Sequence, residues 1–223
     1  MKIDFDFRLL DVSLELYALE EYLELIEQYI ERAGNSERLN LAAAITKGNL
    51  TPDDPEWHKI HQNYEGRIEF LLPRILRSPF LVSLYAVYES AVTEIARLIQ
   101  ERKGLAISLD NSKGDNFLDR AKKYYKHDLG FELCKDNSAW QQINMLSELR
   151  NALAHANGRL KMLKEQSRKR ILDWEKRGIG VHQDSGYIVV DAAFARKTFR
   201  LVRGSLDDLV ARFKEWDGPQ GSV

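Results

Sequence analysis

The clearest pattern lies in the first part of the chain, where apolar residues recur at alternating spacings of four and three. The stripe consists of Val12, Leu16, Leu19, Leu23, Ile26 and Ile30. Such a stripe lies along one face of a helix, so it predicts a helix over residues 13–33 that packs against another element. Gly34-Asn35 is typical of a helix C-terminus, and a shorter helix is expected over residues 37–47.

The next region predicts two helices separated by prolines. Residues 56–72 have a helical pattern, which Pro73 is expected to kink or end because proline lacks an amide hydrogen. Ser78-Pro79 is typical of an N-cap followed by proline at the first helical position. The helix that begins there is the most apolar of the chain and is expected to end at Gly104, so we place it in the core.

The remaining pattern is also mostly helical. Further helices are expected over residues 115–127, 138–156, 160–177 and 191–216. Short apolar alternations on either side of residues 183–186 predict a small β-hairpin within residues 178–190. The sequence therefore predicts an all-α fold, a single-domain bundle of about six to eight helices over residues 1–216 with one minor β-hairpin. A flexible tail is expected over residues 217–223.

Composition narrows the class of protein without indicating an activity. Hydrophobic residues make up 44% of the 223 residues and charged residues 30%, which is typical of a folded globular chain. The single cysteine, Cys134, excludes an intrachain disulfide and a thiolate metal cluster. The acidic start over residues 1–7 does not resemble a secretory signal, and the longest uncharged apolar stretch, residues 78–88, is shorter than the roughly 20 residues of a membrane helix. We therefore expect a soluble, cytoplasmic protein.

Charge is distributed unevenly, although the net charge is only −1. Residues 1–37 contain ten acidic and three basic side chains, a net charge of −7, whereas residues 159–177 contain eight basic and three acidic ones, a net charge of +5. Such asymmetry occurs both in oppositely charged solvated helix faces and in proteins that bind a polyanion on one face. The basic segment is therefore a candidate for polyanion binding.

One short motif stands out at the end of the helix expected over residues 138–156. The sequence Arg150-Asn151-Ala152-Leu153-Ala154-His155 resembles the Arg-x4-6-His motif of the HEPN superfamily, in which a polar residue follows the arginine. A second likeness lies upstream: residues 84–90, with Tyr88-Glu89-Ser90, are similar to the apolar helix that carries an aromatic-Glu-Ser/Thr step in several HEPN families. The resemblance covers about residues 60–215 and makes Glu89 a supporting site residue.

The resemblance implies a HEPN-like helical bundle and a metal-independent endoribonuclease that needs no cofactor. RNA supplies its own nucleophile, the 2′-hydroxyl, and the expected products carry a 2′,3′-cyclic phosphate and a 5′-hydroxyl. His155 suits the role of general acid or base, because histidine exchanges protons near neutral pH. Arg150 would hold the scissile phosphate and stabilise developing charge, and Asn151 would orient the imidazole or a phosphate oxygen.

Partners are also implied by the resemblance. HEPN proteins are commonly dimers, so we expect a homodimer in which two motif helices meet and two Arg–His pairs converge on one groove. Many relatives act as toxins or defence nucleases, which implies an antitoxin or another partner protein encoded in the same operon. In HEPN toxins paired with minimal nucleotidyltransferase antitoxins, a modifiable tyrosine often stands two residues after the histidine. Here that position is Asn157, which puts this mode of control in doubt.

Basic residues after the motif are the candidate RNA contacts. The run begins four residues after the histidine and includes Arg159, Lys161, Lys164 and Arg168, with Lys169 and Arg170 next to them. Beside a phosphate site such a run is suited to contacts with the RNA backbone. The segment Lys122-Lys123-Tyr124-Tyr125-Lys126-His127 mixes cations with aromatic rings, as single-strand binders do, or else contributes its tyrosines to the core.

Several alternatives remain at this point. Arg150 can pair with a surface carboxylate while His155 favours a helix C-terminus as a cation. The protein can be a non-catalytic HEPN module that binds RNA, a nucleotide or a partner protein, or a nucleotide-sensing accessory protein of a defence operon. His58, His61 and Glu65 have the spacing of metal ligands on one helical face, although we expect no metal site. Cys134 as a nucleophile has no supporting motif.

Overall fold

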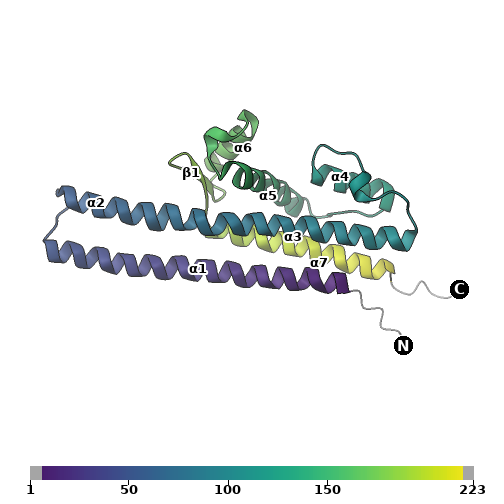
Figure 1. Cartoon of the computed structure of the whole chain (residues 1–223), viewed down its shortest axis with the longest axis horizontal. Coiled ribbons are helices and arrows are strands. Elements are labelled where there is room, and N and C mark those ends of the chain that lie inside the picture. The colour runs from purple at the N-terminus through teal and green to yellow at the C-terminus, as the bar shows by residue number, and fades with distance from the viewer. Residues whose placement is uncertain (1–6, 218–223) are drawn as a thin grey trace. The chain divides into compact units, whose positions relative to one another are not determined.

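The protein is almost entirely helical in the computed structural model, which describes residues 7–217 (Figure 1). The helices are α1 (Phe7–Gly48), α2 (Pro55–Tyr64), α3 (Leu72–Lys103), α4 (Phe117–Tyr124), α5 (Asn137–Ala156), α6 (Glu165–Lys176) and α7 (Ala192–Asp217). A single antiparallel hairpin joins β1 (Val181–Asp184) to β2 (Tyr187–Val190). Helices account for 79% of the chain, which confirms the predicted all-α fold with one minor β-hairpin. Except for Asp217, the expected tail lies outside the described residues.

The chain divides into two compact units, and the motif belongs to the second. Of the described residues, the first unit comprises 7–19, 83–149 and 197–217, and the second comprises 20–82 and 150–196. Helices α1, α3, α5 and α7 each contribute residues to both units. A single HEPN-like domain over residues 1–216 stays a prediction.

The core of the first unit is apolar side chains on α3, α4, α5 and α7. Its fully buried members include Leu84, Ile95, Ile99, Ala121, Ile143, Leu146 and Val202. One polar pair crosses this core, since Gln142 Nε2 donates to Thr198 Oγ1 over 2.7 Å. The end of α3 has the glycine expected from the sequence: Gly104 has a φ of 65°, and its amide and that of Leu105 donate to the carbonyls of Glu101 and Gln100.

In the second unit, the later part of α1 pairs antiparallel with the chain from α2 into α3. Glu27 faces Arg77, Gly34 faces Ile68, and Glu37 faces Arg67, which fixes the register of the two helices. The predicted helix end at Gly34-Asn35 is wrong, because α1 continues to Gly48. Gly34 is buried, and a Cβ at this position would lie 3.2 Å from Ile68 Cγ2. The close approach of the two helices therefore outweighs the roughly 1 kcal/mol that glycine costs inside a helix.

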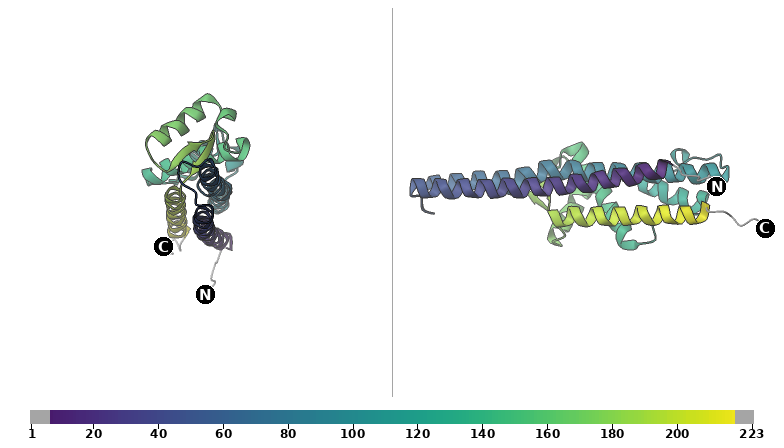
Figure 2. Two further views of the ribbon diagram at one scale, coloured as in Figure 1. Left: turned by 90° about the vertical axis from the view of Figure 1, so that its left-hand side faces the viewer. Right: turned by 90° about the horizontal axis from the view of Figure 1, so that it is seen from below.

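The two prolines do not separate helices as the sequence suggested. Residues Glu65–Leu71 form a π-helical segment between α2 and α3, and the amide of Leu72 donates to the carbonyl of Arg67, five residues back. This wider turn comes directly before Pro73, which has no amide to donate. Pro79 lies inside α3 instead of starting a helix. The segment from Pro55 to Lys103 is thus one continuous ribbon (Figures 1 and 2).

The hairpin confirms the turn signal in the sequence. Val181 pairs with Val190 and Asp184 with Tyr187, so the turn consists of Ser185 and Gly186. Their φ values are 49° and 79°, which is the left-handed backbone of a tight type I′ connection. The helix expected from residue 160 begins later than predicted, because Leu160–Met162 form a short 3-10 turn and α6 starts at Glu165.

One long helix has the length and composition of a membrane span. Within residues 7–217, the helical stretch Pro55–Lys103 contains a window with a mean hydropathy of 1.3, of which 33% is buried. The sequence predicted no stretch long enough to cross a membrane, because that prediction considered only the uncharged residues 78–88. The helix extends far beyond them on both sides. Core helices of soluble proteins have the same length and composition, so this feature is weak evidence for a membrane location.

Candidate functional site

The motif occupies the last two turns of α5. Ala152 and Leu153 are buried and hold this part of the helix to the second unit, whereas Asn151 and His155 are exposed. Asn151 and His155 are four residues apart and therefore lie on one face of the helix. Asn151 and His155 therefore face solvent, whereas Arg150 is half-buried.

Hydrogen bonding orients the arginine of the motif. Arg150 Nη1 donates to Asn151 Oδ1 over 3.0 Å, so the neighbouring amide holds the guanidinium near the exposed face. Asn151 thus contacts Arg150, and its expected role in orienting the imidazole or a phosphate oxygen stays a prediction. Within residues 7–217 the His155 imidazole forms no hydrogen bond or ion pair. An imidazole in this setting is accessible both to solvent protons and to a ligand.

The chain turns sharply after the motif and joins the hairpin. Asn157 and Gly158 have φ values of 49° and 68°, and the amide of Gly158 donates to the carbonyl of Ala152 over 3.1 Å. The predicted helix end at Asn157-Gly158 is therefore confirmed. The Gly158 carbonyl then accepts from the amide of Ile188 over 2.8 Å, and the Leu160 amide donates to Gly186 over 3.0 Å. These bonds extend the hairpin by one short segment.

This extension builds a basic pocket next to the hairpin turn. The pocket has a volume of about 630 Å³ and is lined by Arg159, Leu160, Lys161, Arg168, Ser185, Gly186 and Tyr187. Three of the four predicted RNA contacts line it, and the fourth, Lys164, lies at the N-cap of α6 outside the lining. Their positive charges thus surround one cavity instead of forming a linear track along a helix.

Tyr187 is a pocket residue that the sequence analysis did not single out. The Arg159 guanidinium carbon lies 5.7 Å from the centre of the Tyr187 ring, and that of Arg74 lies 4.5 Å from it. The Phe70 ring is tilted by 58° to the Tyr187 ring, with 5.9 Å between the ring centres. The predicted hairpin turn placed Tyr187 at a strand end, but its arginine neighbours come from α3 and from the segment after α5. No local signal brings these three parts together.

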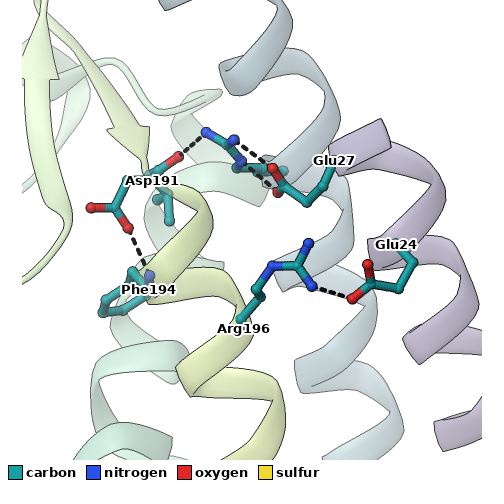
Figure 3. A network of polar contacts seen from close by, with 7 residues as sticks. Glu24, Glu27, Asp191, Phe194 and Arg196 are labelled. Atoms are coloured by element: carbon teal, nitrogen blue, oxygen red, sulfur yellow. Dashed lines mark hydrogen bonds and ion pairs between the residues drawn. The ribbon is translucent and has the colours of Figure 1, made fainter. Parts of the chain in front are cut away.

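A polar network fixes the other end of the hairpin. Arg77 donates to both carboxylate oxygens of Glu27, over 2.8 and 2.7 Å, and its third bond is to the Val190 carbonyl over 3.0 Å. Asp191 Oδ1 caps α7 by accepting from the Phe194 amide, and Arg196 pairs with Glu24 (Figure 3). The strand that carries Tyr187 is thereby held to α1, α3 and α7.

Other predicted residues fall outside this arrangement. Glu89, the proposed supporting residue, is half-buried on α3 and belongs to the first unit, so its role stays a prediction. Tyr124 and Tyr125 are buried, and their hydroxyls donate to the carbonyls of Ile107 and Val92. Burial raises the pKa of the Tyr125 hydroxyl well above its usual value. The tyrosines therefore belong to the core and do not stack on a nucleic acid.

The competing sites gain no support from the geometry. In the described part of the chain no group of three or more His, Cys, Asp or Glu side chains is arranged to hold a metal ion. His61 instead stacks on Trp57 with 3.6 Å between ring centres, and its Nδ1 lies 3.2 Å from the Trp57 carbonyl oxygen. Cys134 donates to the Asp136 carbonyl and accepts from the Ser205 hydroxyl, both over 3.4 Å.

Comparisons with protein-family models, with curated proteins and with solved structures find no match to this chain. The likeness to HEPN proteins thus depends on the motif, the aromatic-Glu-Ser step and the order of helices.

Proposed function

We propose that the protein is a metal-independent endoribonuclease of HEPN type, with Arg150, Asn151 and His155 as its catalytic residues. The observation that carries the proposal is that an arginine, hydrogen-bonded to its neighbour Asn151, and an exposed histidine both lie in the last two turns of one helix. A basic and aromatic pocket begins four residues further along the chain. Together these features combine a candidate proton-transfer group with a surface suited to RNA.

The proposed reaction balances without a cofactor. His155 as general base takes the proton from a ribose 2′-hydroxyl, whose oxygen attacks the adjacent phosphorus. The bond from phosphorus to the 5′-oxygen breaks, and the His155 imidazolium formed in the first step protonates that leaving oxygen. The products are a 2′,3′-cyclic phosphate and a 5′-hydroxyl. Arg150 stabilises the negative charge that develops on the phosphoryl oxygens.

The basic pocket would bind the RNA strand beside the reacting phosphate. Arg159, Lys161 and Arg168 supply positive charge for phosphates, and the half-exposed Tyr187 ring supplies a stacking surface for a base. We propose that the protein works in the cytoplasm, as a homodimer through the motif helix. We also propose a role as a toxin or defence nuclease that an antitoxin or operon partner restrains.

The test is cleavage of varied single-stranded RNAs by the purified protein in the presence of EDTA. Arg150→Ala and His155→Ala should each reduce the rate by about 10²–10⁴-fold, because a positioned acid, base or charge is lost. Their far-ultraviolet circular dichroism should stay unchanged, since His155 is exposed and Arg150 only half-buried. His127→Ala, at an exposed histidine of the first unit, is the matched control and should cleave normally.

The proposal fails if the wild-type protein leaves these RNAs uncut while binding them, or if EDTA abolishes the activity. The first outcome favours a non-catalytic module that binds RNA, a nucleotide or a partner protein. One observation supports that second candidate: neither Arg150 nor His155 lines the basic pocket, so the pocket is able to bind a ligand without the motif.

A further inference from the structure

A second pocket, in the first unit, combines an indole ring with two lysines. It has a volume of about 550 Å³ and is lined by Lys122, Lys126, Gly130, Phe131, Glu132, Leu133, Cys134, Asn137 and Trp140. Its volume lies in the range of small-molecule sites, which is about 300–1,000 Å³. None of these residues belongs to the motif or to the basic pocket, so this site is separate from the proposed nuclease.

The walls of this pocket divide into an apolar part and a cationic part. Trp140 and Phe131 are half-buried and Leu133 is buried, so they form an apolar surface. Lys122 and Lys126 are four residues apart and exposed, and within residues 7–217 neither forms an ion pair with a carboxylate. The one acidic residue of the lining is Glu132, which leaves two cations for one anion.

The lysine closest to the indole lies over its face. Lys122 Nζ is 4.8 Å from the centre of the Trp140 ring, a cation–π distance. A flat ring that stacks on this face of Trp140 would displace the ammonium, which would then lie within reach of a negative group on the same ligand. Lysine also binds phosphate as a point charge without demanding one fixed geometry.

We propose that this pocket binds a nucleoside phosphate, with the base stacked on Trp140 and the phosphate held by Lys122 and Lys126. Asn137 and Glu132 supply an amide and a carboxylate for the polar edge of the base. The nucleoside phosphate is either a free nucleotide or one unit of a single RNA strand, since both present the same ring and phosphate. The inference does not depend on the ribonuclease activity.

Cys134 provides a direct reporter, because it is the only cysteine of the chain and lines this pocket. Iodoacetamide is small and neutral, so the two lysines do not attract or repel it. The rate of Cys134 alkylation in the full chain, followed by intact mass, should fall about tenfold when AMP is present at ten times its dissociation constant. Adenosine and inorganic phosphate at the same concentration should protect much less, because each lacks one half of the ligand.

Two substitutions and one control test the lysines. Lys122→Gln and Lys126→Gln should each raise the dissociation constant of AMP about tenfold, since each removes a charge-assisted contact, so the same AMP concentration should slow alkylation only about twofold. Lys113→Gln, an exposed lysine of the same unit outside the pocket, should protect as the wild type does. All three positions are exposed, so the fold is expected to survive. The ratio of rates with and without AMP is compared within each variant, which cancels any change in thiol reactivity.

The outcomes separate the possibilities. Protection by AMP alone identifies a free nucleotide, whereas equal or better protection by hexa-adenylate identifies a strand of RNA. Unchanged alkylation in millimolar AMP and in hexa-adenylate overturns the inference. Equal protection by inorganic phosphate overturns the base-binding part, and equal protection by adenosine overturns the phosphate-binding part. Cleavage of RNA is measured separately, so a failure here leaves the nuclease proposal standing.

Discussion

The residue that ties the hairpin to the helices of the second unit is Arg77. Its guanidinium uses three nitrogens, two on Glu27 and one on the Val190 carbonyl, and the side chains of the pair are only 10% and 11% exposed. A buried charge of this kind is costly when its partner is removed. The same region requires a glycine at position 180. A Cβ there would lie 2.5 Å from the Asp191 carboxylate, which caps α7.

Arg77→Met should therefore lower the free energy of unfolding by about 3–5 kcal/mol, because Glu27 would stay buried without its cation. Urea denaturation followed by circular dichroism measures this loss. The matched control is Arg67→Met, which breaks the pair with Glu37 on the same two helices, where the side chains are 60% and 30% exposed. Solvent screens that pair, so its loss should cost about 0.5 kcal/mol or less. Equal losses in the two variants would contradict the assigned role of Arg77.

At the scale of the elements, the prolines of the long helix have different consequences. Pro79 lies in the interior of α3, where it has no amide for the carbonyl four residues earlier. Pro79→Ala should raise the free energy of unfolding by about 1–3 kcal/mol, reduced somewhat because alanine also makes the unfolded chain more flexible. Pro55→Ala, at the first position of α2, should change stability little, because no helical partner exists for that amide. Urea denaturation of both variants gives the comparison, and a destabilised Pro79→Ala would show that the proline is required by its surroundings.

The basic pocket also distinguishes residues within one charged run. Arg168 lines the basic pocket and Lys164 does not, although both are exposed residues of the same basic run. Arg168→Ala should weaken single-stranded RNA binding and reduce the slope of log K against log salt by about 0.7, which corresponds to one phosphate contact. Lys164→Ala should change both quantities less. Fluorescence anisotropy over a salt series measures them, and equal effects would favour a diffuse basic face over a pocket.

The elements themselves could mostly be predicted from the sequence, because their signals are local. The hairpin turn at Ser185-Gly186, the glycine stop at Gly104 and the end of α5 at Asn157-Gly158 depend on backbone angles that neighbouring residues favour. The predictions at Gly34 and Pro79 were wrong because each residue usually ends or starts a helix but here lies inside one. Gly34 allows α1 to pack closely against Ile68, and α3 continues through Pro79. The catalytic candidates came from a motif within six residues. The pocket around Tyr187 could not be predicted, because Arg74 and Arg159 are far apart in the sequence.

At the scale of the whole molecule, the geometry of the motif indicates how many protomers form one active site. On an α-helix, residues five apart are separated by about 140° around the axis, so Arg150 and His155 of one chain diverge. Asn151 holds the Arg150 guanidinium near the face that carries His155, but within residues 7–217 the imidazole forms no hydrogen bond or ion pair with it. A symmetric pair of motif helices would place the arginine of one protomer opposite the histidine of the other. We therefore expect the active species to be a homodimer.

Mixing two inactive variants tests this expectation. Arg150→Ala and His155→Ala each form homodimers without a complete site, whereas a mixed dimer retains one arginine and one histidine that face each other across the two-fold axis. Ribonuclease activity should therefore return when the two variants are mixed and allowed to exchange subunits, and it should not return when either is mixed with a double variant. Sedimentation velocity at micromolar concentration should show a dimer for every protein. A strict monomer would contradict the shared site, and a dimer without recovered activity would mean that each chain carries a complete site of its own.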